Sequence, residues 1–277
     1  MPSNPQNASK TIIVSGASGV IGKAICKNLV ALDYDVIMVC RDIKKGEKTR
    51  AEIIAETKKS GITIETADLS RISPIINLAS RIKNPVYALV NNAAITPKRR
   101  EVTADGIEMQ FAANVLNYFW MSLAFHKHLK KSSAPENPAR IVNVASYWAG
   151  DLSLGDLQFK MRHYDNGTAY RQSKQANRML SVALAEQFKD DGILVNACHP
   201  GEVNTPLSNS MGFTGSQTPD QGAKTPVWLA TNKMHDTGKW FDNCEEQPCR
   251  FSADKKEINK LYEICMDFSA PLLKSVK

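Results

Sequence analysis

The sequence predicts an α/β fold, with one domain of 277 residues built around a doubly wound parallel sheet that carries helices on both faces. Short β-branched apolar runs alternate with longer segments of helical periodicity, which is the pattern of repeated β-α-β units. Neither an internal repeat nor a linker interrupts this alternation. Because 43% of the residues are hydrophobic, a chain of this length can bury one large core.

The first half of the chain supplies four predicted strands and two predicted helices. The run Thr11–Ser15 is β-branched, apolar and followed by glycine, so it is predicted to be a buried strand. Gly61 is the expected C-terminal stop of the second helix. The strands are expected over residues 11–15, 35–40, 62–66 and 86–90, and the helices over residues 23–32 and 48–59.

The second half continues the alternation and adds two irregular segments. Residues 147–167 form an insertion with four aromatic side chains, which either line a substrate mouth or cover the core. Residues 207–222 are rich in Gly, Ser and Thr, a composition typical of a mobile substrate lid. Strands are expected over residues 140–146, 193–198 and 238–241, and helices over residues 104–131, from Tyr170 to Lys189, 221–231 and 255–268.

The composition of the chain limits the cellular compartments and the kinds of ligand that we expect. Residues 1–9 are polar and are expected to form a flexible leader rather than a signal peptide, and no apolar run is long enough to span a membrane. Six cysteines without a Cys-x-x-Cys pair favour a reduced, cytoplasmic location. The net charge of +7 comes from scattered Lys and Arg, so we expect an anionic small ligand rather than a nucleic acid.

The sequence contains no convincing set of metal ligands. His126 and His128 do not share a helix face, because residues two apart point in different directions. Cys244 and Cys249 are too widely spaced for a usual zinc knuckle, and they lack a second ligand pair. We therefore expect no metal site.

A glycine-rich turn follows the first strand. Gly16, Gly19 and Gly22 lie between that strand and the first helix. Such an arrangement offers backbone N–H groups and a helix N-terminus to a pyrophosphate, and glycine lets the backbone approach it without a Cβ. The alternative is an ordinary strand-to-helix turn. The position near the start of the chain favours a dinucleotide site.

Two residues of opposite charge follow the second strand, whose end should lie near an adenosine ribose. Asp42 would bind the ribose 2′-hydroxyl of NAD(H), whereas Arg41 would pair with the 2′-phosphate of NADP(H). Arg41 is the first residue past the strand, and Lys44 and Lys45 follow it. We therefore expect NADP(H) rather than NAD(H), with Asp42 pointing away.

Polar side chains follow further strands at the edge where open parallel sheets bind ligands. Asp68 follows the third strand, where it is expected near adenine, and it is also a candidate cap for the next helix, a role compatible with the first. Asn91 and Asn92 end the fourth strand, and Ser146 ends the fifth. Asn114 lies in an apolar helical segment, so its amide needs partners, which a core amide can find within the protein.

Tyr170 and Lys174 are four residues apart on a predicted helix and therefore share a face. At about 4 Å and an effective dielectric near 20, an ammonium attracts a phenolate by about 4 kcal/mol. That matches the roughly 4 kcal/mol needed to lower a phenol pKa from about 10 to about 7. Such a tyrosine can exchange a proton with an alcohol at neutral pH. The alternative is an exposed helical pair.

The order and separation of these motifs resemble the short-chain dehydrogenase/reductase family across nearly the whole chain. Residues 40–42, the insertion before Tyr170 and residues 238–241 are similar to retinol-dehydrogenase and carbonyl-reductase members. The resemblance implies a Rossmann fold and hydride transfer between NADP(H) and a carbonyl compound or a primary or secondary alcohol. The matching residues are the glycine turn at 16–22, Asp68-Leu69, Asn91-Asn92-Ala93, Asn114, Ser146, Tyr170-x-x-x-Lys174 and Pro200-Gly201.

The resemblance also implies a role for each matching residue. Tyr170 would be the general acid/base, and Lys174 would lower its pKa and bind the nicotinamide ribose. Ser146 would hold the substrate oxygen, Asn114 would support a proton-relay water, and Asn91 with its neighbouring backbone would contact the ribose. Cofactor contacts are expected at Gly16, Ser18, Gly19, Val20, Ile21, Arg41, Asp68, Leu69, Asn92, Ala93, Tyr170, Lys174, Pro200, Gly201, Val203 and Thr205.

Two residues depart from the family pattern. Val20 stands where the middle glycine is usual, so the glycine spacing is closer to the extended branch of epimerases and dehydratases. That branch needs a larger substrate domain, for which 277 residues leave little room. Ala94 stands where a glycine is usual and would tighten the floor of the site.

The lid and the aromatic insertion favour an apolar small-molecule substrate, which an aldehyde, steroid, retinoid or xenobiotic ketone would satisfy. The pattern is compatible with a homodimer. The non-enzymatic alternative is an NADP(H)-sensing or scaffold protein on the same fold, although this chain keeps the Asn, Ser, Tyr and Lys that such a protein could discard.

Overall fold

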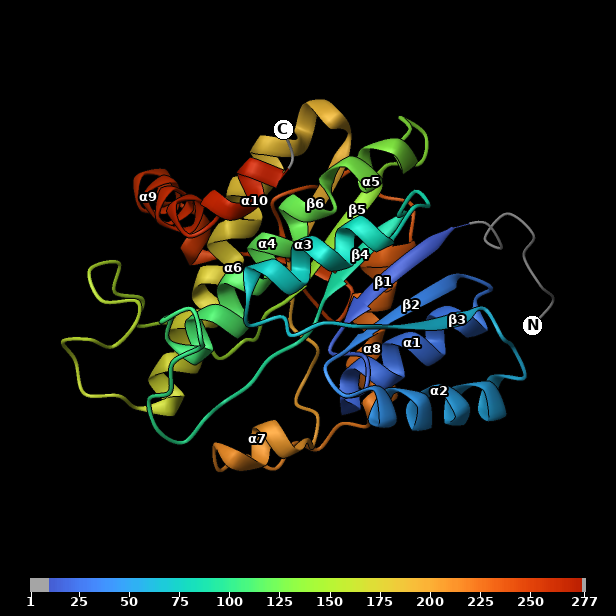
Figure 1. The fold of residues 1–277 in the computed structure, drawn as a ribbon, viewed down its shortest axis with the longest axis horizontal. Helices are drawn as coiled ribbons and strands as arrows, with labels where there is room; N and C mark the ends of the chain where they lie inside the picture. Colours follow the sequence, from blue (N-terminus) through green and yellow to red (C-terminus); the bar gives the residue numbers. More distant parts are fainter. Residues whose placement is uncertain (1–9, 276–277) are drawn as a thin grey trace.

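The computed structural model describes residues 10–275, and the expected leader at residues 1–9 lies outside them. Eight strands form one sheet in the order β3-β2-β1-β4-β5-β6-β7-β8 (Figure 1). Every neighbouring pair is parallel except β7 and β8, a short antiparallel edge that the sequence did not predict. The strands are β1 (Thr11–Ser15), β2 (Asp35–Cys40), β3 (Ile62–Thr66), β4 (Ala88–Asn91), β5 (Ala139–Val144), β6 (Ile193–Cys198), β7 (Trp240–Asp242) and β8 (Glu245–Gln247).

Helices cover both faces of the sheet, which confirms the predicted doubly wound Rossmann fold. Helices α1, α2 and α8 lie on one face, and α3, α4 and α6 lie on the other. The helices are α1 (Val20–Ala31), α2 (Ile43–Thr57), α3 (Ile72–Arg81), α4 (Asn117–Ala124), α5 (His126–Ser132), α6 (Asn166–Phe188), α7 (Pro206–Ser210), α8 (Pro219–Thr231), α9 (Lys255–Asp267) and α10 (Ala270–Ser275), with the π-helix η1 (Phe111–Leu116) and the 3-10 turns η2 (Lys189–Asp191) and η3 (Arg250–Ser252).

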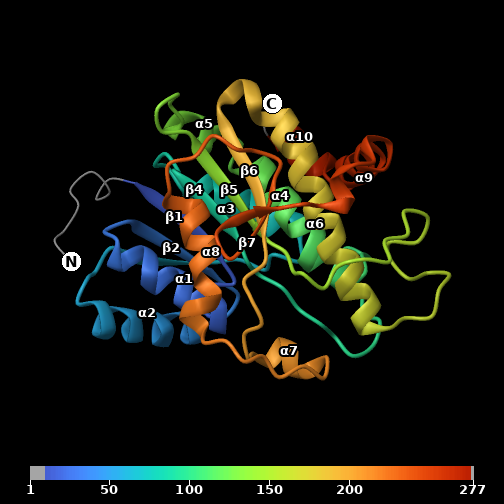
Figure 2. The same cartoon turned by 180° about the vertical axis from the view of Figure 1, so that it is seen from behind.

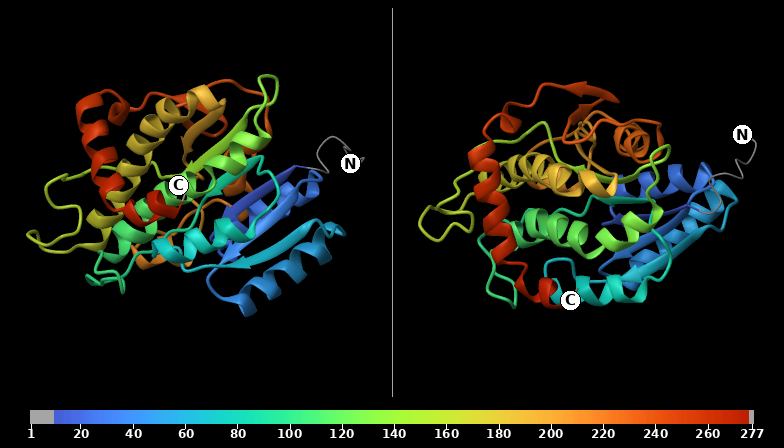
Figure 3. Two further views of the ribbon diagram at one scale, coloured as in Figure 1. Left: turned by 45° about the horizontal axis from the view of Figure 1, so that its top comes forward. Right: turned by 90° about the horizontal axis from the view of Figure 1, so that it is seen from above.

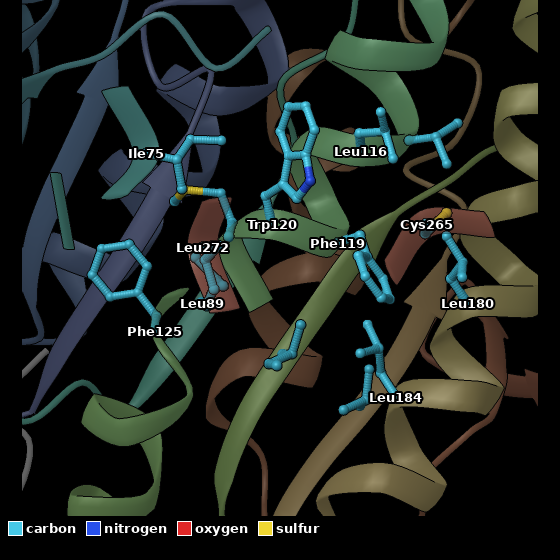
Figure 4. Packing of buried hydrophobic residues seen from close by; sticks show 14 of the residues in the cluster. Ile75, Leu89, Leu116, Phe119, Trp120, Phe125, Leu180, Leu184, Cys265 and Leu272 are labelled. Atoms are coloured by element: carbon cyan, nitrogen blue, oxygen red, sulfur yellow. The ribbon is translucent and has the colours of Figure 1, made fainter. Parts of the chain in front are cut away.

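The sheet separates two apolar cores. The larger core packs α3, α4, α6 and α9 against one face, and Figure 4 shows Trp120, Phe119 and Leu180 within it. The second core packs α1 and α8 against the other face. Both faces of the central strands are therefore buried, which explains why β1 is buried at every position and has a continuous apolar run, residues 12–14, instead of an alternating pattern.

The C-terminal helices extend the larger layer. In both views of Figure 3, the red helices α9 and α10 lie on the side of the molecule away from the N-terminus, where α9 contacts α6 and α10 contacts α3 and α4. Helix α7 stands apart from both helix layers in Figures 1 and 2. It belongs to the segment 207–222 that was predicted to be a substrate lid.

The second helix begins and ends earlier than predicted. Asp42 caps α2 by accepting a hydrogen bond from the Lys45 amide at 3.1 Å, so the helix starts at Ile43 instead of residue 48. It ends at Thr57 because Lys58 takes a left-handed conformation with φ of 59°. The expected stop at Gly61 was therefore wrong.

The predicted helix over residues 104–131 begins later than expected and is then irregular in two places, the stretch Phe111–Leu116 and Phe125. Gly106 has φ of +76° within a turn that Val102 and Glu108 close by pairing, so helical structure starts only after this turn. A π-helical stretch, Phe111–Leu116, precedes α4, and Phe125 separates α4 from α5. Apolar periodicity alone does not show such breaks.

The chain reverses its direction of travel across the sheet between β1 and β4. Strands β2 and β3 lie to one side of β1, while β4, β5 and β6 follow on the other. A crevice forms at the carboxyl ends of strands at such a switch point. The fold thereby brings the glycine turn after β1 and the amides after β4 to one place.

Candidate active site

The glycine turn forms the floor of a cleft at this switch point. Gly16 has φ of +64°, and a Cβ there would lie 2.7 Å from Ala93 Cα. A Cβ on Gly22 would lie 2.3 Å from the Gly16 carbonyl oxygen. The turn and the helix therefore pack so closely that both glycines are required. Helix α1 begins directly after Gly19, so its first-turn amides face the cleft without intrahelical partners.

The cleft has a volume of about 670 Å³ and collects most of the predicted cofactor residues. The glycine turn at its floor and the helix N-terminus fit a dinucleotide pyrophosphate. Val20, despite its unusual place, lines the cleft as the first residue of α1. The predicted residues in the lining are Gly16, Ser18, Gly19, Val20, Ile21, Arg41, Asp68, Leu69, Asn92, Ala93 and Thr205.

Cations line the end of the cleft beside β2. Arg41 lies there with Lys45 and Lys48, and all three side chains are exposed. The Asp42 carboxylate accepts the Lys45 amide and caps α2. Capping gives this carboxylate a structural task at the helix N-terminus, where negative charge is favoured.

Asp68 holds a turn beside the cleft. Its Oδ1 accepts hydrogen bonds from the Ser70 amide at 3.1 Å and the Ser70 hydroxyl at 2.7 Å. Helix α3 starts at Ile72 with Arg71 in the capping position, so the alternative in which Asp68 caps that helix was wrong.

The two asparagines after β4 have different surroundings. Asn91 is fully buried and donates from Nδ2 to Asn143 Oδ1 at 2.9 Å. Contrary to the expectation that it contacts the ribose, its side chain does not line the cleft. Asn92 lines the cleft and donates to the Ser15 carbonyl oxygen at 3.0 Å. Ser15 Oγ in turn accepts the amides of Asn92 and Ala93. Sequence reasoning missed this role of Ser15, which is signalled only by a hydroxyl ending an apolar strand.

The four predicted catalytic residues converge beyond the cleft. Asp165 caps α6 by accepting the Thr168 amide at 2.7 Å, which places Tyr170 and Lys174 in the first turns. Ser146 lies two residues past β5, and its hydroxyl hydrogen-bonds the Tyr170 phenol. Asn114 Nδ2 lies 3.4 Å from Ser173 Oγ on the same helix. All four side chains are buried.

Burial governs the protonation of the tyrosine and the lysine. It raises the pKa of Tyr170 to about 12, and the hydrogen bond with Ser146 offsets this only in part. It also lowers the pKa of Lys174 to about 7. The Lys174 ammonium donates to the Val144 carbonyl oxygen at 2.9 Å and lies 5.5 Å from the Tyr170 ring centroid.

The prediction that Lys174 lowers the pKa of Tyr170 is therefore wrong for this structure. The cost of removing the phenolate from water exceeds the attraction of an ammonium that bonds elsewhere. At neutral pH Tyr170 is a neutral phenol, which can donate a proton.

Asn114 lies within the π-helix η1, an irregularity that is frequent at functional sites. Its Oδ1 accepts the Ile95 amide, and its Nδ2 donates to the Ile95 carbonyl oxygen, both at 2.9 Å. The Asn114 amide therefore has hydrogen-bond partners inside the protein, and these contacts anchor the irregular segment that follows Ala94. Its support of a relay water stays a prediction.

Comparison with known proteins identifies the family. The model of the short chain dehydrogenase family matches residues 10–213. The chain belongs to the short-chain dehydrogenase/reductase family. It is therefore an oxidoreductase that acts on an alcohol or a carbonyl compound with a nicotinamide cofactor, which supplies or accepts the hydride when bound.

Individual relatives agree with this assignment. The chain is 32% identical to mouse retinol dehydrogenase 13 over 93% of its own length and 82% of that protein. It is 30% identical to human retinol dehydrogenase 12, with coverage of 98% and 88%. Among solved structures, an uncharacterised protein from Mycobacterium paratuberculosis superposes with a TM-score of 0.78 at 25% identity, covering 98% of this chain and 96% of that one. The Pseudomonas aeruginosa RhlG/NADP complex shares the fold, with a TM-score of 0.68 at 24% identity and coverage of 85% and 94%.

Most of the predicted residues that follow β6 hold the segment between β6 and α8 together instead of lining the cleft. Gly201 has φ of +85°, and a Cβ there would lie 1.8 Å from Gln217 Oε1. The Gln217 side chain accepts a hydrogen bond from the Glu202 amide at 2.8 Å, and the Gln217 backbone forms a β-bridge with Val203. Of the predicted residues here, Thr205 lines the cleft and caps α7, whereas Pro200, Gly201 and Val203 are absent from the lining.

The predicted lid contacts both sides of the site. Ser210 hydrogen-bonds Thr96 at 2.7 Å, and the Phe213 ring meets the Trp148 ring edge-on at 4.7 Å. Trp148 lies 6.1 Å from the Tyr170 ring. The aromatic residues of the insertion therefore have two different surroundings: Trp148 lies beside Tyr170, whereas Phe159 is buried against Tyr164.

Proposed function

We propose that this chain is an NADP(H)-dependent reductase of apolar aldehydes or ketones, which also oxidises the corresponding alcohols. The observation that carries the proposal is the buried, neutral Tyr170, hydrogen-bonded to Ser146 beside a cleft built for a dinucleotide. A phenol at this position can donate its proton to the oxygen of a carbonyl substrate, and we favour the direction of reduction because NADPH is the coenzyme that we propose.

The residues divide the proton chemistry between them. Ser146 Oγ holds the substrate oxygen, and the Tyr170 hydroxyl gives its proton to that oxygen as negative charge develops. Lys174 lies on the same helix face, and its pKa of about 7 lets it exchange a proton near neutral pH. In alcohol oxidation the same groups act in reverse.

The preference for NADP(H) is supported by the charges beside β2. A 2′-phosphate there would meet Arg41, Lys45 and Lys48, which line the cleft. The carboxylate that would bind an unphosphorylated ribose belongs to Asp42, which instead caps α2. Arginine also offers a planar fork that matches phosphate geometry.

An apolar substrate is supported by the aromatic side chains above Tyr170. The Trp148 ring lies near the rings of both Tyr170 and Phe213, and the neighbouring Tyr147 is 74% exposed. The retinol dehydrogenases among the relatives are named for retinol, which is an apolar alcohol.

No helix within residues 10–275 is both long and apolar enough to cross a membrane. We also propose a cytoplasmic location, supported by six cysteines that all carry free thiols.

The test is a screen of carbonyl probes with NADPH and, in parallel, with NADH. The probes are retinal, a medium-chain aliphatic aldehyde, a steroid ketone and an aromatic ketone, and the readout is coenzyme oxidation. We expect NADPH-dependent reduction of at least one apolar probe. Bound NADPH without reduction of any probe or oxidation of the matching alcohols would refute the proposal and favour the sensing or scaffold alternative.

A further inference from the structure

Helix α6 carries a third polar side chain, Arg178, on the face that carries Tyr170 and Lys174. Tyr170, Lys174 and Arg178 follow one another at intervals of four residues, so they lie in one row. The Arg178 side chain is buried, and within residues 10–275 it forms no ion pair with a carboxylate. An arginine is seldom buried in this way, because desolvating its charge is costly.

The contacts of Arg178 lead directly to the catalytic serine. Its Nη2 donates to the Ser146 carbonyl oxygen at 2.5 Å. The guanidinium lies 3.4 Å from the Trp240 ring centroid and also hydrogen-bonds the Cys249 thiol. This contact with the indole ring stabilises the buried cation through its attraction to the ring's π-electrons.

Arg178 and Lys174 act on the same strand end. Lys174 donates to the carbonyl oxygen of Val144, and Arg178 donates to that of Ser146, two residues later. The intervening Ala145 amide donates to the Cys198 carbonyl oxygen of β6 at 2.9 Å. The backbone that leads out of β5 is therefore held by α6 through alternate carbonyls and by β6 between them.

The residues after Ser146 depend on the same backbone. The Trp148 amide donates to Ser146 Oγ at 3.1 Å, and the Tyr147 amide donates to His199 Nδ1 at 3.1 Å. A shift of the Ser146 carbonyl would move its hydroxyl away from Tyr170 and would also move Trp148, which lies above the tyrosine ring. One hydrogen bond from Arg178 therefore affects the positions of both the Ser146 hydroxyl and the Trp148 ring.

We propose that Arg178 is a positioning residue, which fixes the Ser146 backbone so that the serine hydroxyl stays within reach of the Tyr170 phenol. The proposal rests on the proposed function for the role of Ser146. A purely packing role would be served better by an apolar side chain against Trp240, because it would avoid the burial of a charge.

The experiment compares Arg178→Met with Arg250→Met and adds Arg178→Lys. Arg250 is an exposed arginine of η3 whose guanidinium lies over the Phe251 ring and whose charge acts on Arg178, so its removal deletes one nearby charge without removing a hydrogen bond to Ser146. Two readouts are taken: hydrogen exchange of the Tyr147 and Trp148 amides, which needs no substrate, and kcat on the best probe of the screen. NADPH affinity is measured by fluorescence titration.

We expect Arg178→Met to accelerate exchange at both amides and to lower kcat by roughly 10²-fold, the scale of a misplaced catalytic group. NADPH affinity should not change, and Arg250→Met should match the wild type in every readout. Arg178→Lys keeps a donor and a charge, so it should recover part of kcat. If Arg178→Met does not fold, Arg178→Lys against Arg250→Met gives the same comparison with a smaller loss.

Equal exchange and equal kcat in the Arg178 and Arg250 variants would overturn the proposal. It would also be overturned by faster exchange throughout the sheet together with lost NADPH binding, because that pattern indicates a general structural role. If the wild type turns over no probe, the proposed function fails, and the exchange of the Tyr147 and Trp148 amides alone decides the positioning of Ser146.

Discussion

The nucleotide cleft and the catalytic cluster lie side by side, yet they are built differently. The cleft is formed by backbone, with Gly16 and Gly22 packed too closely to admit a Cβ, and its charged groups, such as Arg41, are exposed. The catalytic cluster is formed by side chains, and Tyr170 and Lys174 are both buried. Water therefore screens the charges of the first region and is excluded from the second.

This difference predicts how each region responds to change. An exposed cation in the cleft shares its task with neighbouring cations, so its loss should cost only part of the binding free energy. A buried group in the catalytic cluster has no such substitute, and its protonation depends on desolvation. The variants below separate the two regions, and they are ordered from the largest expected effect to the smallest.

Tyr170→Phe should abolish catalysis while leaving nucleotide binding intact. The phenyl ring keeps the packing against Trp148 but removes the hydroxyl that we propose as the proton donor to the substrate oxygen. General acid catalysis contributes about 10²- to 10⁴-fold, so kcat should fall by that factor. The measurement is kcat on the best carbonyl probe together with an NADPH titration.

Tyr262→Phe is the matched control for this variant. Tyr262 is a residue of α9 that packs edge-on against Phe119 of the larger core, and it does not line the cleft. It should keep wild-type kcat. Comparable turnover by Tyr170→Phe and Tyr262→Phe would show that another group transfers the proton.

Lys174→Met should change how stability depends on pH. Burial lowers the pKa of Lys174 from 10.5 to about 7, so between these values the unfolded chain binds a proton that the folded chain does not. The free energy of unfolding should therefore rise with pH across this window, with a slope approaching about 1.4 kcal/mol per pH unit, and level off below pH 7 where both states are protonated.

Urea unfolding at several pH values within that window measures this slope. The wild type is compared with Lys174→Met, which lacks the titrating group, and with Lys44→Met, which removes an exposed lysine. The difference between variants cancels other groups, such as Tyr170, whose raised pKa lowers stability at higher pH. Parallel curves for wild type and Lys174→Met would show that Lys174 remains charged in the folded state.

The backbone-built region could be predicted well from sequence. Glycines between a strand and a helix have few structural readings, and Gly16, Gly19 and Val20 all lie where the turn was expected. The alternation of strands and helices likewise predicted the doubly wound parallel sheet, although the order of its strands came from the structure. These features are local, so spacing along the chain is enough to find them.

The side-chain-built region could be predicted only in part. Tyr170 and Lys174 were found from their spacing, but spacing does not report burial, and burial sets the pKa of each in this structure. Arg178 was missed because its partners, Ser146 and Trp240, come from distant segments. Sequence patterns identify the residue types at a site more readily than the burial of those residues, which determines their pKa values.

The cofactor preference is the part of the proposed function that a single binding measurement can decide. It depends on Arg41, which lies in the cleft, while Asp42 caps α2. Charge-assisted hydrogen bonds contribute about 1.5–3 kcal/mol. Because Lys45 and Lys48 share the task, we expect the loss for Arg41→Ala to lie near the lower end, roughly tenfold in NADPH affinity. Lys44→Ala is the control, since Lys44 is exposed and does not line the cleft.

The most direct measurement is a parallel fluorescence titration with NADPH and NADH of the wild type, Arg41→Ala and Lys44→Ala. We expect the wild type and Lys44→Ala to bind NADPH clearly more tightly than NADH, and Arg41→Ala to lose roughly tenfold in NADPH affinity with NADH affinity unchanged. Equal affinities for the two coenzymes in the wild type, or tighter binding of NADH, would contradict an NADP(H)-dependent enzyme and would direct the search toward oxidation of alcohols with NAD.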